Sequence, residues 1–157
     1  MIKLFTDGSS HPQTNIGVGA YLLILDDIKS IELLKADIKT KKFKDTSSTK
    51  LEVQTMLWAL KNISQTNEEI IIYTDCQNII GLANRRKRFE ANNYLTKKGK
   101  IIANHDLYKE FYKLTDTLNC QFIKVKGHKE SSQKDEIDKI FTLVDKASRD
   151  KLRNELL

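Results

Sequence analysis

The stretch Ile2-Lys3-Leu4-Phe5-Thr6-Asp7-Gly8-Ser9 is a short apolar run that ends on a carboxylate just before a turn. A second run of the same kind, Ile70-Ile71-Ile72-Tyr73-Thr74-Asp75-Cys76, also closes on Thr-Asp. Runs of β-branched and aromatic residues bounded by polar ones indicate buried strands. If these two strands are parallel neighbours, Asp7 and Asp75 meet at one edge of the sheet, where open α/β sheets place ligands. Two carboxylates that close together favour a divalent cation between them, although each Asp alone could simply cap a strand or begin a helix.

Further strands and helices follow from the periodicity of the apolar residues on either side of these two runs. We expect strands at 16–25 and 30–38 joined by a turn at Asp26-Asp27, a helix over 51–63, a helical start at 76–80, a helix capped by 104–106, a strand at 120–125 and a helical region from about Asp135. This order predicts the α/β class in its mixed α+β form. The first three strands form an antiparallel meander, the last two run parallel to the first, and helices cover the faces of this five-stranded mixed sheet.

The composition is that of one globular domain, which we expect to span residues 1–157. Hydrophobic residues make up 39% and charged residues 31% of the chain. No apolar run approaches the roughly 20 residues that cross a bilayer, and the N-terminal run is too short for a secretion signal, so we expect a cytoplasmic protein without membrane contact. Cys76 and Cys120 have no metal-ligand spacing and are expected to be reduced thiols.

The net charge of +6 is concentrated in one segment, residues 84–100. This segment holds seven basic residues and one acidic residue, and it therefore accounts for the whole excess: Arg85, Arg86, Lys87, Arg88, Lys97, Lys98 and Lys100 against Glu90. A local basic patch with Phe89 and Tyr94 in it suits a polyphosphate backbone, the aromatics serving to stack or to anchor the segment. A solvated helix face that happens to be basic is the alternative.

Two further features bear on a site near Asp7. Glu52 lies on one apolar stripe of the 51–63 helix, four residues before Met56, so its carboxylate faces the sheet from the first turn. From the helix alone it is either a favourable first-turn acid or a site residue. Gly17 and Gly19 interrupt the second strand, where glycine often admits a close neighbour or a ligand, or marks a bulge.

Four motifs now stand in a distinctive order: Thr-Asp-Gly-Ser at 6–9, Glu52 after Ser-Ser-Thr-Lys-Leu, Thr-Asp-Cys-Gln at 74–77, and Lys-Gly-His at 126–128 followed by Val-Asp-Lys-Ala-Ser-Arg at 144–149. Together they resemble type 1 ribonuclease H from Ile2 to about Leu152. The resemblance implies an RNase H-like fold with a basic protrusion at about 84–100. It also implies that Asp7, Glu52, Asp75 and Asp145 bind metal and that His128 is a catalytic histidine on a mobile loop.

What the resemblance implies chemically is hydrolysis of the RNA strand of an RNA·DNA hybrid by a two-metal mechanism. Carboxylates without Cys or His ligands suit two Mg²⁺ ions, with Mn²⁺ as an alternative. His128 would relay protons or help product leave. Two family loops that contact the hybrid differ here, and Gln13, Asn15, Ser48 and Thr49 are the replacements we expect to bind nucleic acid. Arg85, Arg86, Lys87, Arg88, Lys97 and Lys98 would contact the same hybrid, and we expect a monomer.

Alternatives remain for the fourth acid and for the substrate. Asp138 lies at the distance from His128 that a shorter loop would give, but Asp145 has the Asp-x-Ala-small-Arg continuation of the family and is therefore preferred. A nuclease for branched DNA, such as a junction resolvase, would use a similar set of acids. A hybrid-binding module without catalysis is the third reading, and the retention of all four acids and His128 argues against it.

Overall fold

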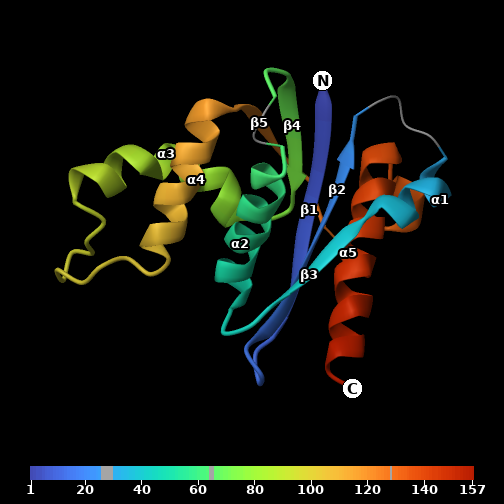
Figure 1. Cartoon of the computed structure of the whole chain (residues 1–157), viewed down its shortest axis with the longest axis horizontal. Helices are drawn as coiled ribbons and strands as arrows, with labels where there is room; N and C mark the ends of the chain where they lie inside the picture. Colours follow the sequence, from blue (N-terminus) through green and yellow to red (C-terminus); the bar gives the residue numbers. More distant parts are fainter. Residues whose placement is uncertain (26–29, 64–65, 128) are drawn as a thin grey trace.

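The centre of the fold is a five-stranded sheet in the order β3-β2-β1-β4-β5 (Figure 1). It is seen in a computed structural model that describes residues 1–25, 30–63, 66–127 and 129–157. The strands are β1 (Ile2–His11), β2 (Ile16–Ile24), β3 (Lys39–Phe43), β4 (Glu69–Thr74) and β5 (Asn119–Lys124). β1, β2 and β3 pair antiparallel, whereas β4 pairs parallel with both β1 and β5. The predicted mixed sheet with an N-terminal meander is confirmed.

Helices cover both faces of this sheet (Figure 1). They are α1 (Ile31–Leu34), α2 (Ser48–Lys61), α3 (Gln77–Ala91), α4 (His105–Thr117) and α5 (Glu136–Glu155), with short 3-10 turns at Lys35–Asp37 and Ser131–Gln133. α2 and α4 pack on one face, where they share a core with alternate residues of the strands such as Leu4 and Ile72. α5 packs on the other face against Phe5, Leu22 and Tyr73. No helix in the described ranges is both long and apolar enough to cross a bilayer.

The region between β2 and β3 differs from the prediction of a strand over 30–38. Residues 31–34 form α1, residues 35–37 form a 3-10 turn, and the third strand lies at 39–43. Ile31 and Leu34 both face the α5 side of the core, and their spacing of three residues suits one helical turn. The sequence does not predict the strand at 39–43 because three of its five residues are lysines. Lysine is common on exposed edge strands, where its charge discourages further pairing.

α2 approaches the sheet closely because the strands carry glycine beneath it. A Cβ on Gly19 would lie 2.1 Å from Oγ1 of Thr55, and one on Gly17 would lie 2.8 Å from Cδ2 of Leu51. These glycines therefore admit a helix. The helix begins three residues before the predicted Leu51, after Ser47, whose side chain accepts a hydrogen bond from the backbone N–H of Lys50 at 3.3 Å.

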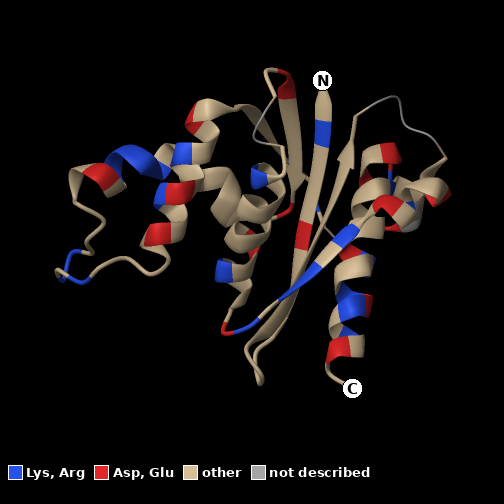
Figure 2. Ribbon diagram, viewed as in Figure 1, with Lys and Arg blue, Asp and Glu red and all other residues tan. Residues whose placement is uncertain are grey.

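The basic segment projects from the sheet as the second half of α3 and the connection to α4 (Figure 2). Phe89 and Tyr94 are buried, with Phe89 stacked on Tyr108 of α4 at a centroid distance of 5.7 Å. Phe89 and Tyr94 were expected either to stack on nucleic acid or to anchor the segment, and the structure shows that they anchor it. Gly99 lies at φ 79°, as the predicted turn there requires. The predicted turn at Asp26-Asp27 lies outside the described residues, and so does His128.

Candidate active site

Asp7 lies inside β1 with 4% of its surface exposed. Because side chains alternate along a strand, Asp7 shares the α5 side of the sheet with Phe5, and its neighbour Gly8 faces α2. β1 continues to His11, so the prediction that the strand ends at Asp7 is wrong. Asp7 pairs with Ala20 of β2, so its carboxylate is held by a paired strand, which makes its position more rigid than a loop would.

Glu52 reaches the same place from the second turn of α2; the prediction of a first-turn position is wrong because the helix begins at Ser48. A Cβ on Gly8 would lie 2.9 Å from Cδ2 of Leu51 and 3.5 Å from Oε1 of Glu52, so the absence of a side chain at Gly8 lets this turn settle on β1. The backbone of Gly8 donates a hydrogen bond to the Glu52 carboxylate. The other oxygen, Oε2, is buried and has no hydrogen-bond partner among the described residues.

Asp75 completes a cluster of three carboxylates. β1 and β4 are parallel with Phe5 opposite Tyr73, and two residues further along each chain are Asp7 and Asp75. One oxygen from each of Asp7, Glu52 and Asp75 lies within 4.8 Å of the others. The meeting of the two Thr-Asp motifs at neighbouring strands is therefore confirmed, and Glu52 joins them from the helix.

The proximity of these acids changes their protonation. Burial, followed by the charges of Glu52 and Asp75, raises the pKa of Asp7 to about 9. Burial, followed by the charges of Asp75 and Asp145, raises the pKa of Glu52 to about 8, and the Gly8 hydrogen bond opposes this rise. The cluster thus holds protons at neutral pH unless a cation replaces them, because like charges in a buried site cannot all ionise together.

Asp145 approaches the cluster from the third turn of α5. Its carboxyl group lies close enough to that of Asp7 to help raise the pKa of Asp7, and it lines the same cleft, which has a volume of about 530 Å³. Ser148 fixes the helix at this level, because its hydroxyl is 2.9 Å from that of Ser9 on β1 and donates to the backbone carbonyl of Asp145 at 2.8 Å. Arg149 is 3.0 Å from the Asp145 carboxylate.

Asp138, the other acid considered, also lines the cleft but faces different partners. Its Oδ2 accepts hydrogen bonds from Nζ of Lys129 at 2.9 Å and from the backbone N–H of Asp135 at 3.2 Å. Asp135 in turn accepts from the backbone N–H of Asp138 at 2.8 Å, which completes a capping box at the start of α5. The Lys129 ammonium holds the pKa of Asp138 below its ordinary value.

Basic side chains surround the acids at the mouth of the cleft. They are Lys126, Lys129, Lys134 and Arg149. Lys126 and Arg149 belong to motifs noted in the sequence, but none of the four was predicted to bind substrate, because lysine is frequent throughout this chain. The spacing of Arg149 from Asp145, four residues along a helix, was the one signal available.

The residues expected at the two loops lie together. Asn15 lies in the turn between β1 and β2, and Thr46 lies just before α2. The backbone N–H of Thr46 donates to the carbonyl of Asn15 at 2.9 Å, so the turn contacts the start of the helix. Gln13, Asn15, Ser48 and Thr49 are all exposed there. They form one polar surface, on which their contact with nucleic acid remains a prediction.

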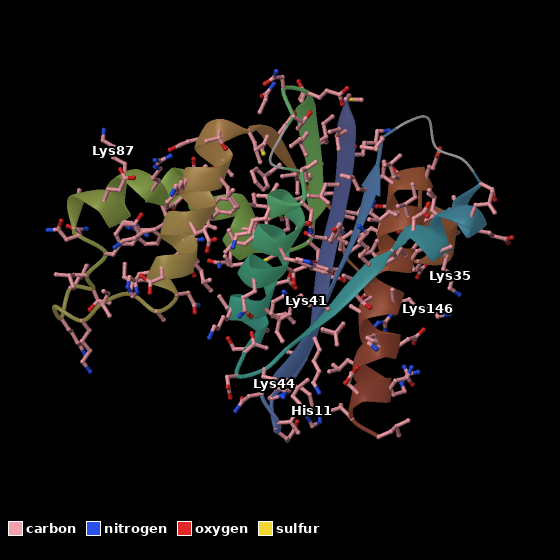
Figure 3. The ribbon with its side chains drawn as sticks, in the orientation of Figure 1. His11, Lys35, Lys41, Lys44, Lys87 and Lys146 are labelled. Atoms are coloured by element: carbon pink, nitrogen blue, oxygen red, sulfur yellow. The ribbon has the colours of Figure 1, made fainter. Side chains whose placement is uncertain are left out.

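The basic residues of the protrusion divide into two kinds. Arg85 donates to the side chain and the backbone carbonyl of Asn78, and Arg86 makes a two-pronged contact with Asp116 of α4 at 2.5 and 2.8 Å. Arg85 therefore stabilises α3 itself, and Arg86 links α3 to α4. Lys87 and Arg88 are exposed, as are Lys97 and Lys98 in the loop, and Figure 3 shows Lys87 projecting away from α3.

The mixed sheet, the three carboxylates that converge beside its first strand and the comparisons with known proteins together define the class of protein, a nuclease. The model of the RNase H family matches residues 1–146, and the chain belongs to that family. The Ribonuclease H of Clostridium botulinum (strain Hall) is 28% identical over 143 residues, which cover 88% of this chain and 91% of that protein. The Ribonuclease H of Caldicellulosiruptor saccharolyticus is 25% identical over 142 residues, covering 88% and 92%.

Solved structures show the same fold. A foamy viral protease-reverse transcriptase in complex with dsDNA superposes with a TM-score of 0.69 at 12% identity, covering 94% of this chain and 93% of that chain. The foamy viral protease-reverse transcriptase in complex with RNA/DNA hybrid gives a TM-score of 0.71 at 9% identity, covering 95% of this chain and 19% of that chain. At such identities the likeness establishes the arrangement of the chain.

Proposed function

We propose that this protein is an endonuclease that hydrolyses the RNA strand of RNA·DNA hybrids with the help of Mg²⁺. The observation that carries the proposal is the convergence of Asp7, Glu52 and Asp75 to within 4.8 Å in a chain of the RNase H family. The relatives named Ribonuclease H support the substrate class. Asp145 is proposed as the fourth acid, supported by its closeness to Asp7, whose pKa it helps to raise, and by its place on the cleft.

The residues present fit a divalent cation. The buried Oε2 of Glu52 has no hydrogen-bond partner among the described residues, and a buried oxygen without a partner is costly unless something else satisfies it. The donor set consists of carboxylates only, which suits Mg²⁺ or Mn²⁺. When bound, such ions lower the pKa of a coordinated water and neutralise charge on the leaving oxygen of a phosphodiester.

The chain's own residues would orient the acids and receive the phosphate. Ser9 and Ser148 hold α5 so that Asp145 faces Asp7, and the Gly8 backbone holds Glu52. Lys126 and Lys134, which line the cleft, would attract the phosphate backbone that the acids alone would repel. The exposed Lys87 and Arg88, with Lys97 and Lys98, would contact the hybrid further along, and Gln13, Asn15, Ser48 and Thr49 would contact it at the start of α2.

Several further expectations belong to the same proposal. His128 would relay a proton or assist product release. The chain would act as one domain over residues 1–157, as a monomer and in the cytoplasm.

The deciding experiment is a gel assay of 5′-labelled RNA·DNA hybrid, duplex RNA, duplex DNA and a four-way DNA junction, each with and without Mg²⁺. We expect cleavage of the RNA in the hybrid alone and only with the metal. Asp7→Asn should abolish cleavage while hybrid binding persists. Cleavage of the junction in preference to the hybrid would replace the proposed substrate, and full activity of Asp7→Asn would refute the site.

A further inference from the structure

The start of α5 carries a contact that the proposed chemistry does not use. Asp138 is 7% exposed although it is charged, and its Oδ2 is occupied by two donors, Nζ of Lys129 and the backbone N–H of Asp135. A charged group this buried is costly unless it is paired and hydrogen-bonded. Its Oδ2 is thus engaged within the protein, which separates Asp138 from the acids that converge on Asp7.

The partner of Asp138 belongs to the connection from β5 to α5, and that connection lies against the acid cluster. A Cβ on Gly127 would be 3.4 Å from Oδ2 of Asp75, so Gly127 lies beside one of the proposed metal-binding acids. Lys129 follows two residues later and is tied to Asp138 at 2.9 Å. Lys126, Gly127 and Lys129 all line the cleft together with Asp7 and Asp75.

A second link closes the other end of this connection. Nζ of Lys134 donates to Oγ1 of Thr142 at 2.9 Å, and that hydroxyl donates to the backbone carbonyl of Asp138 at 2.9 Å. The segment 129–134 is therefore fastened to the first two turns of α5 at both ends. In contrast to the lysines that remain available to phosphate, Lys129 has its ammonium committed to a buried carboxylate.

We propose that Asp138 is a positioning residue that, through its ion pair with Lys129, holds the segment around Gly127 against Asp75 at the edge of the active site. The expected effect of Asp138 on cleavage rests on the proposed function, whereas its expected effect on the segment around Gly127 does not. Breaking the pair should loosen the cleft wall beside Asp75 while leaving the metal-binding acids in place. Misplacement of a group beside reacting atoms can cost up to about a hundredfold in rate, and here we expect roughly a tenfold loss of kcat with KM nearly unchanged.

Asp138→Asn and Lys129→Met test this from the two ends of the contact. The amide of Asp138→Asn can still accept from the Asp135 N–H, so it removes the charge and keeps the cap, whereas Lys129→Met leaves the capping box untouched. Hydrogen exchange of a peptide covering 126–130 should quicken at least several-fold in both. The double variant should be no worse than either single one, because both remove the same contact.

The matched control is Lys42→Met, which removes an ion pair of 3.2 Å between β3 and the far end of α5. It should leave exchange in 126–130 and kcat unaltered. Mn²⁺ affinity, measured by calorimetry without nucleic acid, should stay within about twofold of the parent in Asp138→Asn, since Asp138 is not a ligand, and Asp138→Glu should restore kcat.

Unaltered exchange in both variants, or additive losses in the double variant, would overturn the positioning role. A tenfold or larger loss of Mn²⁺ affinity in Asp138→Asn would show instead that Asp138 is a ligand. Should the parent protein fail to cleave a hybrid, the proposed function falls, while exchange and Mn²⁺ affinity still decide the role of Asp138.

Discussion

Replacing Asp7 by Asn should stabilise the metal-free protein although it destroys the active site. Two carboxylates with oxygens within 4.8 Å repel each other by about 3.5 kcal/mol at an effective dielectric constant of about 20. Asp7 faces both Glu52 and Asp75 at such distances, but proton uptake relieves part of the repulsion. We therefore expect the variant to be more stable to urea by about 3 kcal/mol in EDTA at pH 9.

The pH dependence of this gain has a definite sign. The pKa of Asp7 is about 9 in the folded protein and ordinarily 3.8, so the folded state binds a proton that the unfolded state releases throughout that interval. The stability of the metal-free parent then falls as pH rises from about 4 to about 9. Asp7→Asn loses this contribution, and its advantage should shrink when unfolding is measured at pH 5. Added Mg²⁺ should stabilise the parent more than the variant.

Asp138→Asn is the matched control because this acid has the opposite environment. Its pKa lies below the ordinary value, so its charge contributes stability above about pH 4 that is lost as pH falls through the folded-state pKa. The variant should thus be less stable than the parent at pH 9. If Asp7→Asn were instead less stable than the parent in EDTA at pH 9, the electrostatic account of the acid cluster would be wrong.

Three other substitutions separate the functions of the charged residues. Glu52→Gln should weaken Mn²⁺ binding at least tenfold by calorimetry, and an unaltered affinity would show that Glu52 is not a ligand. The Mn²⁺ affinity of the parent should rise between pH 6 and 9, because protons leave the carboxylate cluster over that range. Lys87→Gln with Arg88→Gln should weaken hybrid binding and reduce the slope of log K against log salt by about 1 to 2; an unaltered slope would place these side chains away from the substrate. Arg86→Gln should lower Tm and leave that slope nearly unaltered, because the Arg86 guanidinium is held by Asp116.

The three central acids were accessible to sequence reasoning because each rests on a regular periodicity. Alternation along β1 and β4 carries Asp7 and Asp75 to neighbouring strands, and helical spacing turns Glu52 toward the sheet. The strand at 39–43 was not accessible in that way. Its lysines are polar by composition, yet Lys39 and Lys41 extend over the rings of Tyr21 and Trp58 with Nζ 5.9 and 5.8 Å from the centroids. Only the tertiary partner makes that segment a strand.

The choice between Asp145 and Asp138 shows where local patterns stop being sufficient. Both acids lie on α5 and line the cleft, seven residues or about two helical turns apart, so helix periodicity alone turns them to nearly the same side. What separates them is the depth at which the helix meets β1, held by the hydroxyls of Ser9 and Ser148 at 2.9 Å. This contact puts Asp145 at the level of Asp7 and leaves Asp138 beside Lys129, a partner beyond the helix. The same carboxylate chemistry therefore serves two purposes on one helix, because one acid meets other acids and the other meets an ammonium group.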